Sequence, residues 1–403
     1  MRQRMQGWRK RQGWWQRGSR LPFVLVVTLV AGGISALINT GAGTVASGAS
    51  APAIRHVFVI MLENESSKST FGNPAADPYL AKTLPSLGAF LPNYYGVGHV
   101  SNDNYAAFVS GQPPNLLNQT DCIKYSNFIN LFTLNGVDEG LGCVFPAATQ
   151  TIGNQLTAAG LSWKGYMQDM GNIPGREAAA CGHPALGATD GTQTAVPGDG
   201  YATRHDPFPY FHSIIDNVAY CDAHVVALGN PDGSMPAAAL PGETGLATDL
   251  GSIATTPNFS FISPNLCMDG HDFPCKNQPS GASALADIDQ FLQTWVPKIR
   301  ASPAFQTDGL LLITFDEGSE TDGASCCGET PNLTSPLSGL SGLGGGKVGA
   351  VLLSPDIKPG TVTTAAYNHF SALATFETLF GLGRLGEART VTSTFSRDVF
   401  TGP

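Results

Sequence analysis

Basic residues are scarce in most of this 403-residue chain. Seven of its 22 lysines and arginines lie in the first 20 residues, which contain no acidic side chain. Residues 52–403 carry 15 basic and 31 acidic side chains, a formal charge of −16. Because nucleic-acid-binding proteins present clustered basic surface, this composition argues against a nucleic-acid partner.

The basic N-terminal segment is followed by one apolar run, residues 21–38, and then by small residues ending in Ala49-Ser50-Ala51. This order is typical of a secretory signal peptide. Eighteen apolar residues also reach the lower limit for crossing a bilayer. Residues 1–51 are therefore predicted to be a signal peptide or an N-terminal anchor plus linker. In both cases residues 52–403 are expected to be secreted or extracytoplasmic, with membrane contact only through residues 21–38 if they are retained.

The chain contains no C-x-x-C pair, no internal repeat and no heptad pattern. All eight cysteines follow residue 51, and an even number in an exported chain predicts up to four disulfides rather than a structural zinc site. Cys122 and Cys143 are the best local pair. Cys326 and Cys327 are adjacent, and we expect them to bond to two different partners because neighbouring cysteines pair only under strain.

Short apolar runs and amphipathic stretches alternate along residues 52–403. Strands are predicted over 56–62, 163–167, 258–262, 310–315 and 348–353, and helices over 105–109, 152–161, 282–300 and about 369–380. This alternation predicts an α/β fold, a mostly parallel central sheet flanked by helices on both faces. Residues 52–403 are predicted to form a single domain with loop insertions near 182–204 and 319–347, which are rich in Gly, Ser, Thr and Pro.

Two of the predicted strands end in acidic or amide side chains. Glu63-Asn64 follows the strand 56–62, and Asp316-Glu317 follows the strand 310–315. The carboxyl ends of parallel strands meet at one edge of a sheet, where α/β proteins bind ligands. Oxygen ligands of this kind suit a hard or borderline divalent metal ion, although solvated strand-end acids would give the same pattern.

Ser101 is the candidate nucleophile, because it stands where a loop enters a predicted helix whose N-terminus favours an anion. A helix-capping serine would look the same. Asn104, one turn later, could point its amide at the same anion. Three histidines, His205, His271 and His369, lie in loop-like polar contexts and could ligate a metal, bind phosphate or protonate a leaving group. Each could equally be a hydrogen-bonded loop residue.

Six motifs in order resemble those of the bacterial phosphoesterase family that contains phospholipases C and acid phosphatases, within the alkaline-phosphatase-like superfamily. The first is Glu63-Asn64-Glu65-Ser66-Ser67 with Phe71-Gly72, where Ser67-Lys68 replaces the usual Phe-Asp. The others are Gly98-His99-Val100-Ser101 through Tyr105, Arg204 through Phe208, Ser263-Pro264-Asn265 with His271-Asp272, Thr314 through Gly318, and Ser354-Pro355 with Lys358-Pro359-Gly360.

The resemblance implies an alkaline-phosphatase-like fold and a role for each matching residue. A divalent metal ion would be held by Glu63, Asn64, Ser101, Asp316 and Glu317. Ser101 would also be the nucleophile, and His205 and His271 would act beside the phosphoryl group. Substrate would be bound by Asn104, Asp272 and His369.

The expected function is that of an exported, metal-dependent acid phosphatase that hydrolyses phosphomonoesters through a phosphoserine intermediate. The alternative is a phospholipase C-type phosphodiesterase acting on phospholipid head groups. Serine at position 101 favours the phosphatase, because threonine is typical of the phospholipase branch. No C-x-P-x-R segment supplies a sulfatase nucleophile. A different class, a non-catalytic surface-binding protein on the same fold, would lack a predicted ligand or Ser101, and all are present.

Overall fold

The computed structural model of the chain describes residues 53–275, 281–336, 342 and 344–400. The predicted signal peptide or anchor, residues 1–51, lies outside the described residues. All described residues belong to one unit of the chain, Ser50–Pro403.

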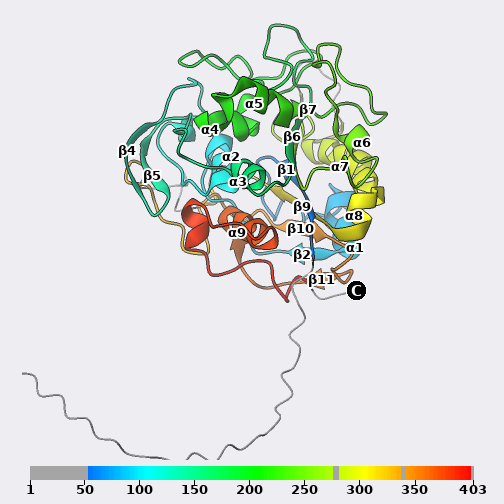
Figure 1. Cartoon of the computed structure of the whole chain (residues 1–403). Helices are drawn as coiled ribbons and strands as arrows, with labels where there is room; N and C mark the ends of the chain where they lie inside the picture. The colour runs from blue at the N-terminus through cyan, green and yellow to red at the C-terminus, as the bar shows by residue number, and fades with distance from the viewer. Residues whose placement is uncertain (1–52, 276–280, 337–341, 343, 401–403) are drawn as a thin grey trace, which may run out of the picture. The chain divides into compact units, whose positions relative to one another are not determined.

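The central element of this unit is an eight-stranded sheet (Figure 1). Its strands lie in the order β11 (Thr361–Val362), β2 (Ala89–Leu91), β10 (Ala350–Leu353), β9 (Gly309–Phe315), β1 (His56–Leu62), β8 (Phe259–Ser263), β6 (Trp163–Met167) and β7 (Val225–Ala227). From β9 to β7 every neighbouring pair is parallel. Only β10 runs against its two neighbours, so the predicted mostly parallel sheet is confirmed.

The two middle strands are buried along their whole length. All seven residues of β1 and all seven of β9 are buried, and the two strands pair from His56 opposite Gly309 to Leu62 opposite Phe315. Strands covered on both faces have no polar side, which explains their continuous apolar sequences. The matched register also brings both carboxyl ends to the same level.

Helices cover both faces of the sheet. Figure 1 shows α1 (Leu84–Leu87), α7 (Ala284–Ala301) and α8 (Pro303–Asp308) on one side, and α2 (Ser101–Ser110), α3 (Ile152–Ala158) and α9 (His369–Leu379) on the other. The apolar stripe of α7, which includes Leu285, Ile288, Leu292 and Trp295, is buried as its helical spacing predicts. The α/β class with helices on both faces is thus confirmed.

Smaller elements complete the unit. The short helices are η1 (Tyr79–Thr83), η2 (Asn118–Thr120), η3 (Thr203–His205), η4 (Phe208–Tyr210), α4 (His212–Ile215), α5 (Val218–His224), α6 (Leu246–Asp249) and η5 (Gly386–Arg389). Two further pairs of strands are β3 (Tyr94–Tyr95) with β12 (Tyr367–Asn368), and β4 (Ile129–Leu134) with β5 (Val137–Leu141).

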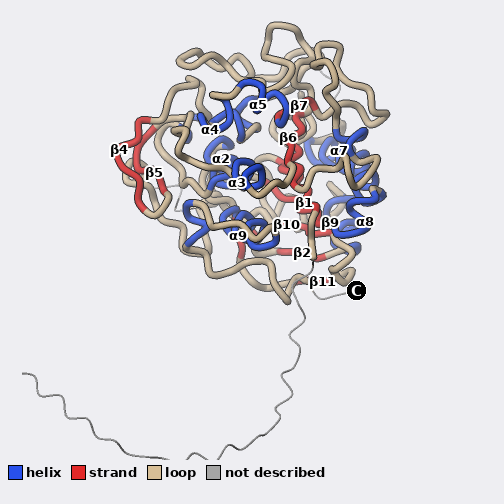
Figure 2. Tube along the Cα trace, in the orientation of Figure 1, coloured by secondary structure: helices blue, strands red, loops and turns tan. Residues whose placement is uncertain are grey.

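Long stretches without helix or strand connect several elements (Figure 2). One of them, between β6 and η3, contains most of the predicted insertion 182–204. Of the other predicted insertion, residues 319–336, 342 and 344–347 are described. Within the described ranges no helix has the length and apolar character that a bilayer span requires.

All eight cysteines are paired. The disulfides join Cys122 to Cys143 as predicted, Cys181 to Cys221, Cys267 to Cys275, and Cys326 to Cys327. The expectation of separate partners for Cys326 and Cys327 is wrong. The other six cysteines pair among themselves, and a turn in which Cys327 and Gly328 both have positive φ, 70° and 81°, accommodates the adjacent pair.

Candidate active site

The carboxyl ends of β1 and β9 bring two acidic residues together. The backbone N–H of Asp316 donates to Leu62 O at 2.9 Å, and that of Asn64 donates to Asp316 Oδ1 at 3.1 Å. Asn64 has a φ of 61°, the left-handed conformation that asparagine tolerates better than most residues. This turn directs the chain away from the sheet immediately after Glu63, which is fully buried.

Ser101 is the first residue of α2, and its hydroxyl lies against Glu63. Ser101 Oγ donates to Glu63 Oε2 at 2.8 Å, so the side chain does not cap its own helix. The preceding residue, Val100, has a φ of 81°. Such a conformation is costly for a β-branched residue and clusters at functional sites. All ten residues of α2 are buried, so the protein holds this serine from every side.

Asn104 shapes the loop that leads to Ser101. Its Oδ1 accepts from the backbone N–H groups of Val97 and Gly98, and its Nδ2 donates to the carbonyls of Gly98 and Val100. A Cβ on Gly98 would overlap the Asp103 carboxylate, so the tight loop requires glycine there. The amide of Asn104 is thus engaged with backbone groups, and its substrate-binding role stays a prediction.

His205 faces Glu63 from the opposite side. Its Nδ1 lies 3.0 Å from Asp269 Oδ2, its Nε2 lies 3.4 Å from Glu63 Oε1, and the Tyr105 ring stacks on it at 5.4 Å. Burial lowers the pKa of His205 well below its usual value, and the positive charge of Arg204 acts in the same direction. The neutral ring that donates from Nδ1 to Asp269 leaves its Nε2 lone pair directed at Glu63.

His271 is oriented by two neighbours. Its Nδ1 lies 2.7 Å from Asp272 Oδ1, and its Nε2 lies 3.0 Å from Arg204 Nη2. Because a guanidinium can only donate, Nε2 accepts and Nδ1 carries the proton in this arrangement. Burial alone would raise the pKa of Asp272, but the hydrogen bond from His271 and the positive charge of Arg204 lower it. Asp272 therefore orients His271 through this bond.

Glu317 directs its carboxylate toward His99. Its Oε2 contacts His99 Nδ1 and accepts from the Val100 backbone N–H at 3.3 Å. The other His99 nitrogen, Nε2, donates to the carbonyl of Asp322 at 3.0 Å. Burial lowers the pKa of His99. The hydrogen bond to Glu317 and the negative charge of Glu317 together outweigh burial, so the net shift of the pKa is upward. The predicted loop 319–347 thus contacts the site through Asp322.

His369 lies behind Asp316. Its Nε2 donates to the carbonyl of Asp316 at 2.6 Å, and its Nδ1 lies 3.2 Å from the Tyr94 hydroxyl. Burial lowers the pKa of His369 to about 4, so the ring is neutral at ordinary pH. With both ring nitrogens engaged inside the protein, His369 supports the Asp316 turn, and its contact with substrate stays a prediction.

The site contains more buried negative charge than its own cations neutralise. Burial raises the pKa of Asp316 to about 6 and of Glu317 to about 7. Burial also raises the pKa values of Glu63 and Asp269 well above the usual range, and the charge of Asp316 adds to both shifts. Carboxylates packed this closely without a cation resist ionisation.

Several polar atoms of the site are suited to hold a metal ion. Within the described part of the chain, Glu63 Oε1, Asp316 Oδ2 and His205 Nε2 are buried without a hydrogen bond of ordinary geometry. One ligand atom each from Glu63, His205 and His271 lies within 4.8 Å of the other two. Glu63 Oε1 and His205 Nε2 are both acceptors, so a proton or a cation must separate them. These residues fit a divalent ion, although the group differs from the predicted set by including two histidines.

Sequence reasoning missed four residues of the site. Asp269, Arg204, Tyr105 and His99 all stand inside the motifs quoted above, but none ends a strand or opens a helix. Their motif positions were the available signal. Their partners, up to 218 positions away in the sequence, show only in three dimensions.

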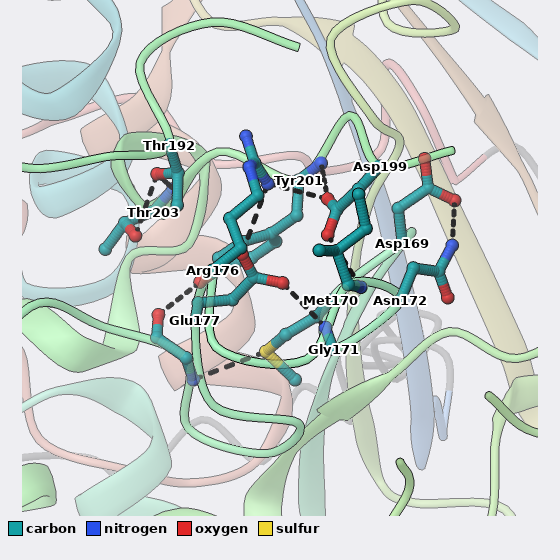
Figure 3. A network of polar contacts seen from close by, with 12 residues as sticks. Asp169, Met170, Gly171, Asn172, Arg176, Glu177, Thr192, Asp199, Tyr201 and Thr203 are labelled. Atoms are coloured by element: carbon teal, nitrogen blue, oxygen red, sulfur yellow. Dashed lines mark hydrogen bonds and ion pairs between the residues drawn. The ribbon is translucent and has the colours of Figure 1, made fainter. Parts of the chain in front are cut away.

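A buried network holds the loop that presents Arg204 and His205. Figure 3 shows the Arg176 guanidinium beside the carboxylates of Glu177 and Asp199, at 3.2 and 2.6 Å. Asp199 Oδ1 accepts from the Tyr201 N–H at 3.0 Å, and Thr203 N donates to Thr192 Oγ1 at 2.8 Å. These contacts order residues 169–202, which lack helix and strand.

The model of the Phosphoesterase family matches residues 86–383. The chain belongs to the Phosphoesterase family. This membership confirms the predicted family and places the chain among hydrolases of phosphate esters.

The individual relatives share only about a quarter of their aligned residues with this chain. An acid phosphatase of Aspergillus fumigatus is 25% identical over 334 residues, which are 83% of this chain and 56% of the fungal protein. A probable acid phosphatase of Kluyveromyces lactis is 24% identical, over 87% of this chain and 64% of that protein. A phosphatidylinositol-3-phosphatase of Mycobacterium tuberculosis is 23% identical, over 91% and 88%. The chain thus spans less than two thirds of the length of each of the two fungal relatives.

Among solved structures, a protein of the alkaline phosphatase superfamily from Vibrio parahaemolyticus aligns with a TM-score of 0.46 and 13% identity. The alignment covers 86% of this chain and 72% of that one. The strand order and the parallel register described above establish the α/β class independently of this likeness.

Proposed function

We propose that this phosphoesterase is an exported, metal-dependent acid phosphatase that hydrolyses phosphomonoesters through a phosphoserine intermediate. The observation that carries the proposal is the contact of 2.8 Å between Ser101 Oγ and the buried carboxylate of Glu63 at the start of α2. A hydroxyl beside a base, at a helix N-terminus, has the arrangement of an activated nucleophile.

Ser101 attacks phosphorus in this proposal. Its hydroxyl already donates to Glu63 Oε2, so Glu63 is placed to receive the proton as Ser101 attacks. A divalent ion bound at this edge would stabilise the negative charge of the phosphoryl group and of the attacking oxygen. The buried α2 fixes the direction of attack, which is the larger part of phosphoryl-transfer catalysis.

Arg204 supplies the positive charge for the phosphoryl oxygens. It is 2% exposed, and its Nη2 lies beside His271 at 3.0 Å while Gln193 holds its Nη1 at 3.1 Å. A guanidinium fixed in this way can donate to two oxygens of one phosphoryl group. His271, adjacent to it and oriented by Asp272, is placed to give a proton to the departing alcohol once it becomes protonated.

The relatives support the phosphomonoester over the phosphodiester. All three sequence relatives above are named as phosphatases, two of them as acid phosphatases. Substrates of this chain are accordingly proposed to be small phosphate esters, with a phosphorylated lipid head group as a second source of the same chemistry. The four disulfides suit the proposed extracytoplasmic location.

The test uses the purified chain and its Ser101→Ala variant. Release of phosphate from a nitrophenyl phosphomonoester is compared with hydrolysis of a nitrophenyl phosphocholine diester, from pH 4 to 9, with and without chelator. The proposal expects monoester turnover that falls by at least about 10³-fold in Ser101→Ala and that is lost with chelator.

Ser110→Ala is the matched control, because Ser110 is buried on the same helix and its hydroxyl contacts backbone groups alone, donating to the Ala106 carbonyl and accepting from the Gln112 N–H. Unchanged turnover in Ser101→Ala would contradict the nucleophile. Preference for the diester would replace the phosphatase by a phospholipase C-type enzyme.

A further inference from the structure

The hairpin β4–β5 presents an apolar face to solvent that the candidate active site does not use. Every residue of β4 is exposed, and its four large apolar side chains are at least half exposed: Ile129 62%, Leu131 60%, Phe132 50% and Leu134 58%. We propose that this face docks on a phospholipid bilayer and brings the site to phosphomonoester head groups. The proposal rests on the function proposed above and adds a membrane contact to the one expected through residues 21–38.

The four apolar side chains lie on one face of β4 because the polar side chains turn to the other. Asn130 Nδ2 and Thr133 Oγ1 both donate to Asp138 Oδ1, at 3.1 and 2.6 Å, and Asp138 is buried. Side chains alternate along a strand, so the residues on either side of Asn130 and of Thr133 face outward, and these are the four apolar residues. The pairing register shifts between positions 130 and 132, which supplies the extra residue that this arrangement needs.

The inner side of the hairpin is fastened to the rest of the unit. The disulfide between Cys122 and Cys143 ties the chain together next to the base of the hairpin. Near its tip, Gln112 Nε2 donates to the Gly136 carbonyl at 2.8 Å, and Gln112 Oε1 accepts from the Asp138 N–H at 2.8 Å. These contacts hold β5 in place, so the apolar face of β4 is directed outward before any partner binds.

The charges around this face suit phosphate head groups. Residues 122–137 contain one basic side chain, Lys124, and no acidic one, although residues 52–403 carry 31 acidic and only 15 basic side chains. Lys124 is exposed before β4 begins. Arg389 is exposed at the other end, where a Cβ on Gly136 would lie 3.1 Å from the Arg389 Nε. An apolar face with a basic side chain at each end matches the acyl region and the phosphates of a bilayer.

A second copy of the chain fits this face less well than a bilayer does. A twofold axis would bring the same face of two copies together, so the basic residues at the ends of one face would meet basic residues of the other. Like charges placed opposite each other destabilise a strand pair. The register shift in β4 acts in the same direction, because a bulge at an edge discourages pairing with another strand.

The loop that leads to β4 begins at the candidate active site. Asp121 Oδ1 accepts from the Asn102 N–H, directly after Ser101, at 3.1 Å, and Asp121 Oδ2 lies 3.7 Å from Arg204 Nε. Ile123, which is 54% exposed, follows Asp121 by two residues, so their Cα atoms are within about 7 Å of each other. Exposed apolar side chains thus continue from β4 toward the arginine that we propose binds phosphate.

Hydrogen exchange of the full chain is the direct test, because it reports each segment separately, whatever residues 21–38 do at the membrane. The probe is a vesicle of phosphatidylcholine with phosphatidylglycerol. We expect vesicles to slow deuterium uptake of residues 126–141 by at least about tenfold and to leave uptake of α5 unchanged. Unchanged uptake of residues 126–141 would overturn the proposal. Slow uptake that appears without vesicles as the protein concentration rises would assign the face to a second copy and would also overturn it.

The variant that removes the face combines Leu131→Gln with Phe132→Gln, two exposed side chains outside the inner contacts of the hairpin. The matched control combines Val218→Gln with Ile253→Gln, which are 68% and 47% exposed on other elements. The first variant should lose the effect of vesicles on residues 126–141, and the control should keep it. Leu134→Gln serves if the first variant does not fold. An effect of vesicles that survives loss of the apolar face would contradict the proposal.

Hydrolysis of phosphatidic acid in vesicles, compared with that of nitrophenyl phosphate in solution, tests the consequence for catalysis. We expect the variant with two glutamines on β4 to raise KM for phosphatidic acid at least about tenfold and to change KM for the soluble ester less than about twofold, since docking concentrates only the lipid ester. Equal changes for the two esters would overturn the proposal. If the wild-type chain hydrolyses neither ester, the proposed function fails, and hydrogen exchange with vesicles still decides whether the face docks.

Discussion

Arg204 illustrates how a single side chain can join several parts of the site. Its three guanidinium nitrogens contact Gln193, His271 and, at 3.7 Å, Asp121. A lysine ammonium is one point charge on a flexible stem and cannot make these contacts together. The geometry of the guanidinium, rather than its charge alone, is therefore needed.

We expect Arg204→Lys to lower kcat/KM for a phosphomonoester by about 10²-fold, the loss that follows removal of one preorganised donor. Arg384→Lys is the control, because Arg384 lies on a partly exposed turn after α9. The measurement is steady-state kinetics at fixed pH, with circular dichroism to verify folding. Equal kcat/KM for wild type and Arg204→Lys would show that a positive charge suffices.

Glu377, which lies away from the candidate active site, makes the free energy of unfolding depend on pH. Burial raises its pKa to about 8, although its Oε1 accepts from the Leu385 N–H at 2.7 Å. Between the unfolded value of about 4.3 and pH 8, the unfolded chain releases this proton and the folded chain keeps it. The unfolded state then binds fewer protons, so Glu377 makes the fold less stable as pH rises through this window.

Glu377→Gln removes the titration and keeps the acceptor for Leu385. We expect its Tm to equal that of the wild type at pH 5 and to exceed it at pH 8, as measured by thermal unfolding. Asp356→Asn, at a partly exposed turn, should leave the difference between the two pH values as it is in the wild type. A Glu377→Gln variant that loses as much stability as the wild type between pH 5 and 8 would contradict the assignment.

At the scale of single residues, the sequence alone could place at the candidate site those residues that directly follow a strand or begin a helix. Glu63, Asp316 and Ser101 were found because a strand end or a helix start places them. Asp269 and His99 have no such marker, since their positions depend on partners in other loops. The turn of Glu317 toward His99 could not be predicted for the same reason.

The stability of helix α9 depends on its N-cap residue, Asn368. Asn368 Oδ1 accepts from the Ser371 N–H at 2.9 Å, and its Nδ2 donates to Glu329 Oε1 at 2.8 Å. The second contact fastens the described part of the loop 319–347 to the helix that carries His369. One asparagine thus serves both as a helix cap and as a tether.

We expect Asn368→Ala to lower the free energy of unfolding by about 1–2 kcal/mol, the usual cost of losing an asparagine cap. Asn368→Ser keeps the acceptor for the cap but loses the donor to Glu329, so it should recover about half of that loss. Urea unfolding of the three proteins gives both values. Equal stability of Asn368→Ala and the wild type would show that water replaces the cap.

The elements themselves were predictable where apolar residues recur with a clear period. β1, β9 and α7 were found within two residues of their ends. The hairpin β4–β5 was not, because all six residues of β4 are exposed although Ile129, Leu131, Phe132 and Leu134 are apolar. The pairing of Cys326 with Cys327 was missed because a rule against adjacent pairs overlooks a turn of two positive φ angles.

At the scale of the whole molecule, buried carboxylates lower the stability of the folded unit, and a bound cation would offset this loss. Three buried carboxylates converge where few donors neutralise them: those of Glu63 and Asp316 at strand ends, and that of Asp269 in the loop after β8. Ion binding to the folded state alone stabilises it by about 2.7 kcal/mol when the free ion reaches 100 times its Kd.

We expect chelator to lower the Tm of the chain, and one of Mn²⁺, Zn²⁺, Mg²⁺ or Ca²⁺ to restore it in a dose-dependent way. In Glu63→Gln the Tm should no longer respond to chelator or ion. Glu65→Gln, two residues away and only half-buried, is the matched control and should respond as the wild type does. A Tm of Glu63→Gln that follows the wild type would place the ion elsewhere.

The complete burial of α2 has a consequence for how the molecule exchanges with water. No face of Ser101–Ser110 meets solvent, so the helix has no local opening that exposes its amides without disturbing the core. Deuterium should enter these amides only when the whole unit unfolds. The exchange rate of residues 101–110 would then report global stability directly, and the backbone of Ser101, the proposed nucleophile, would be among the last to exchange.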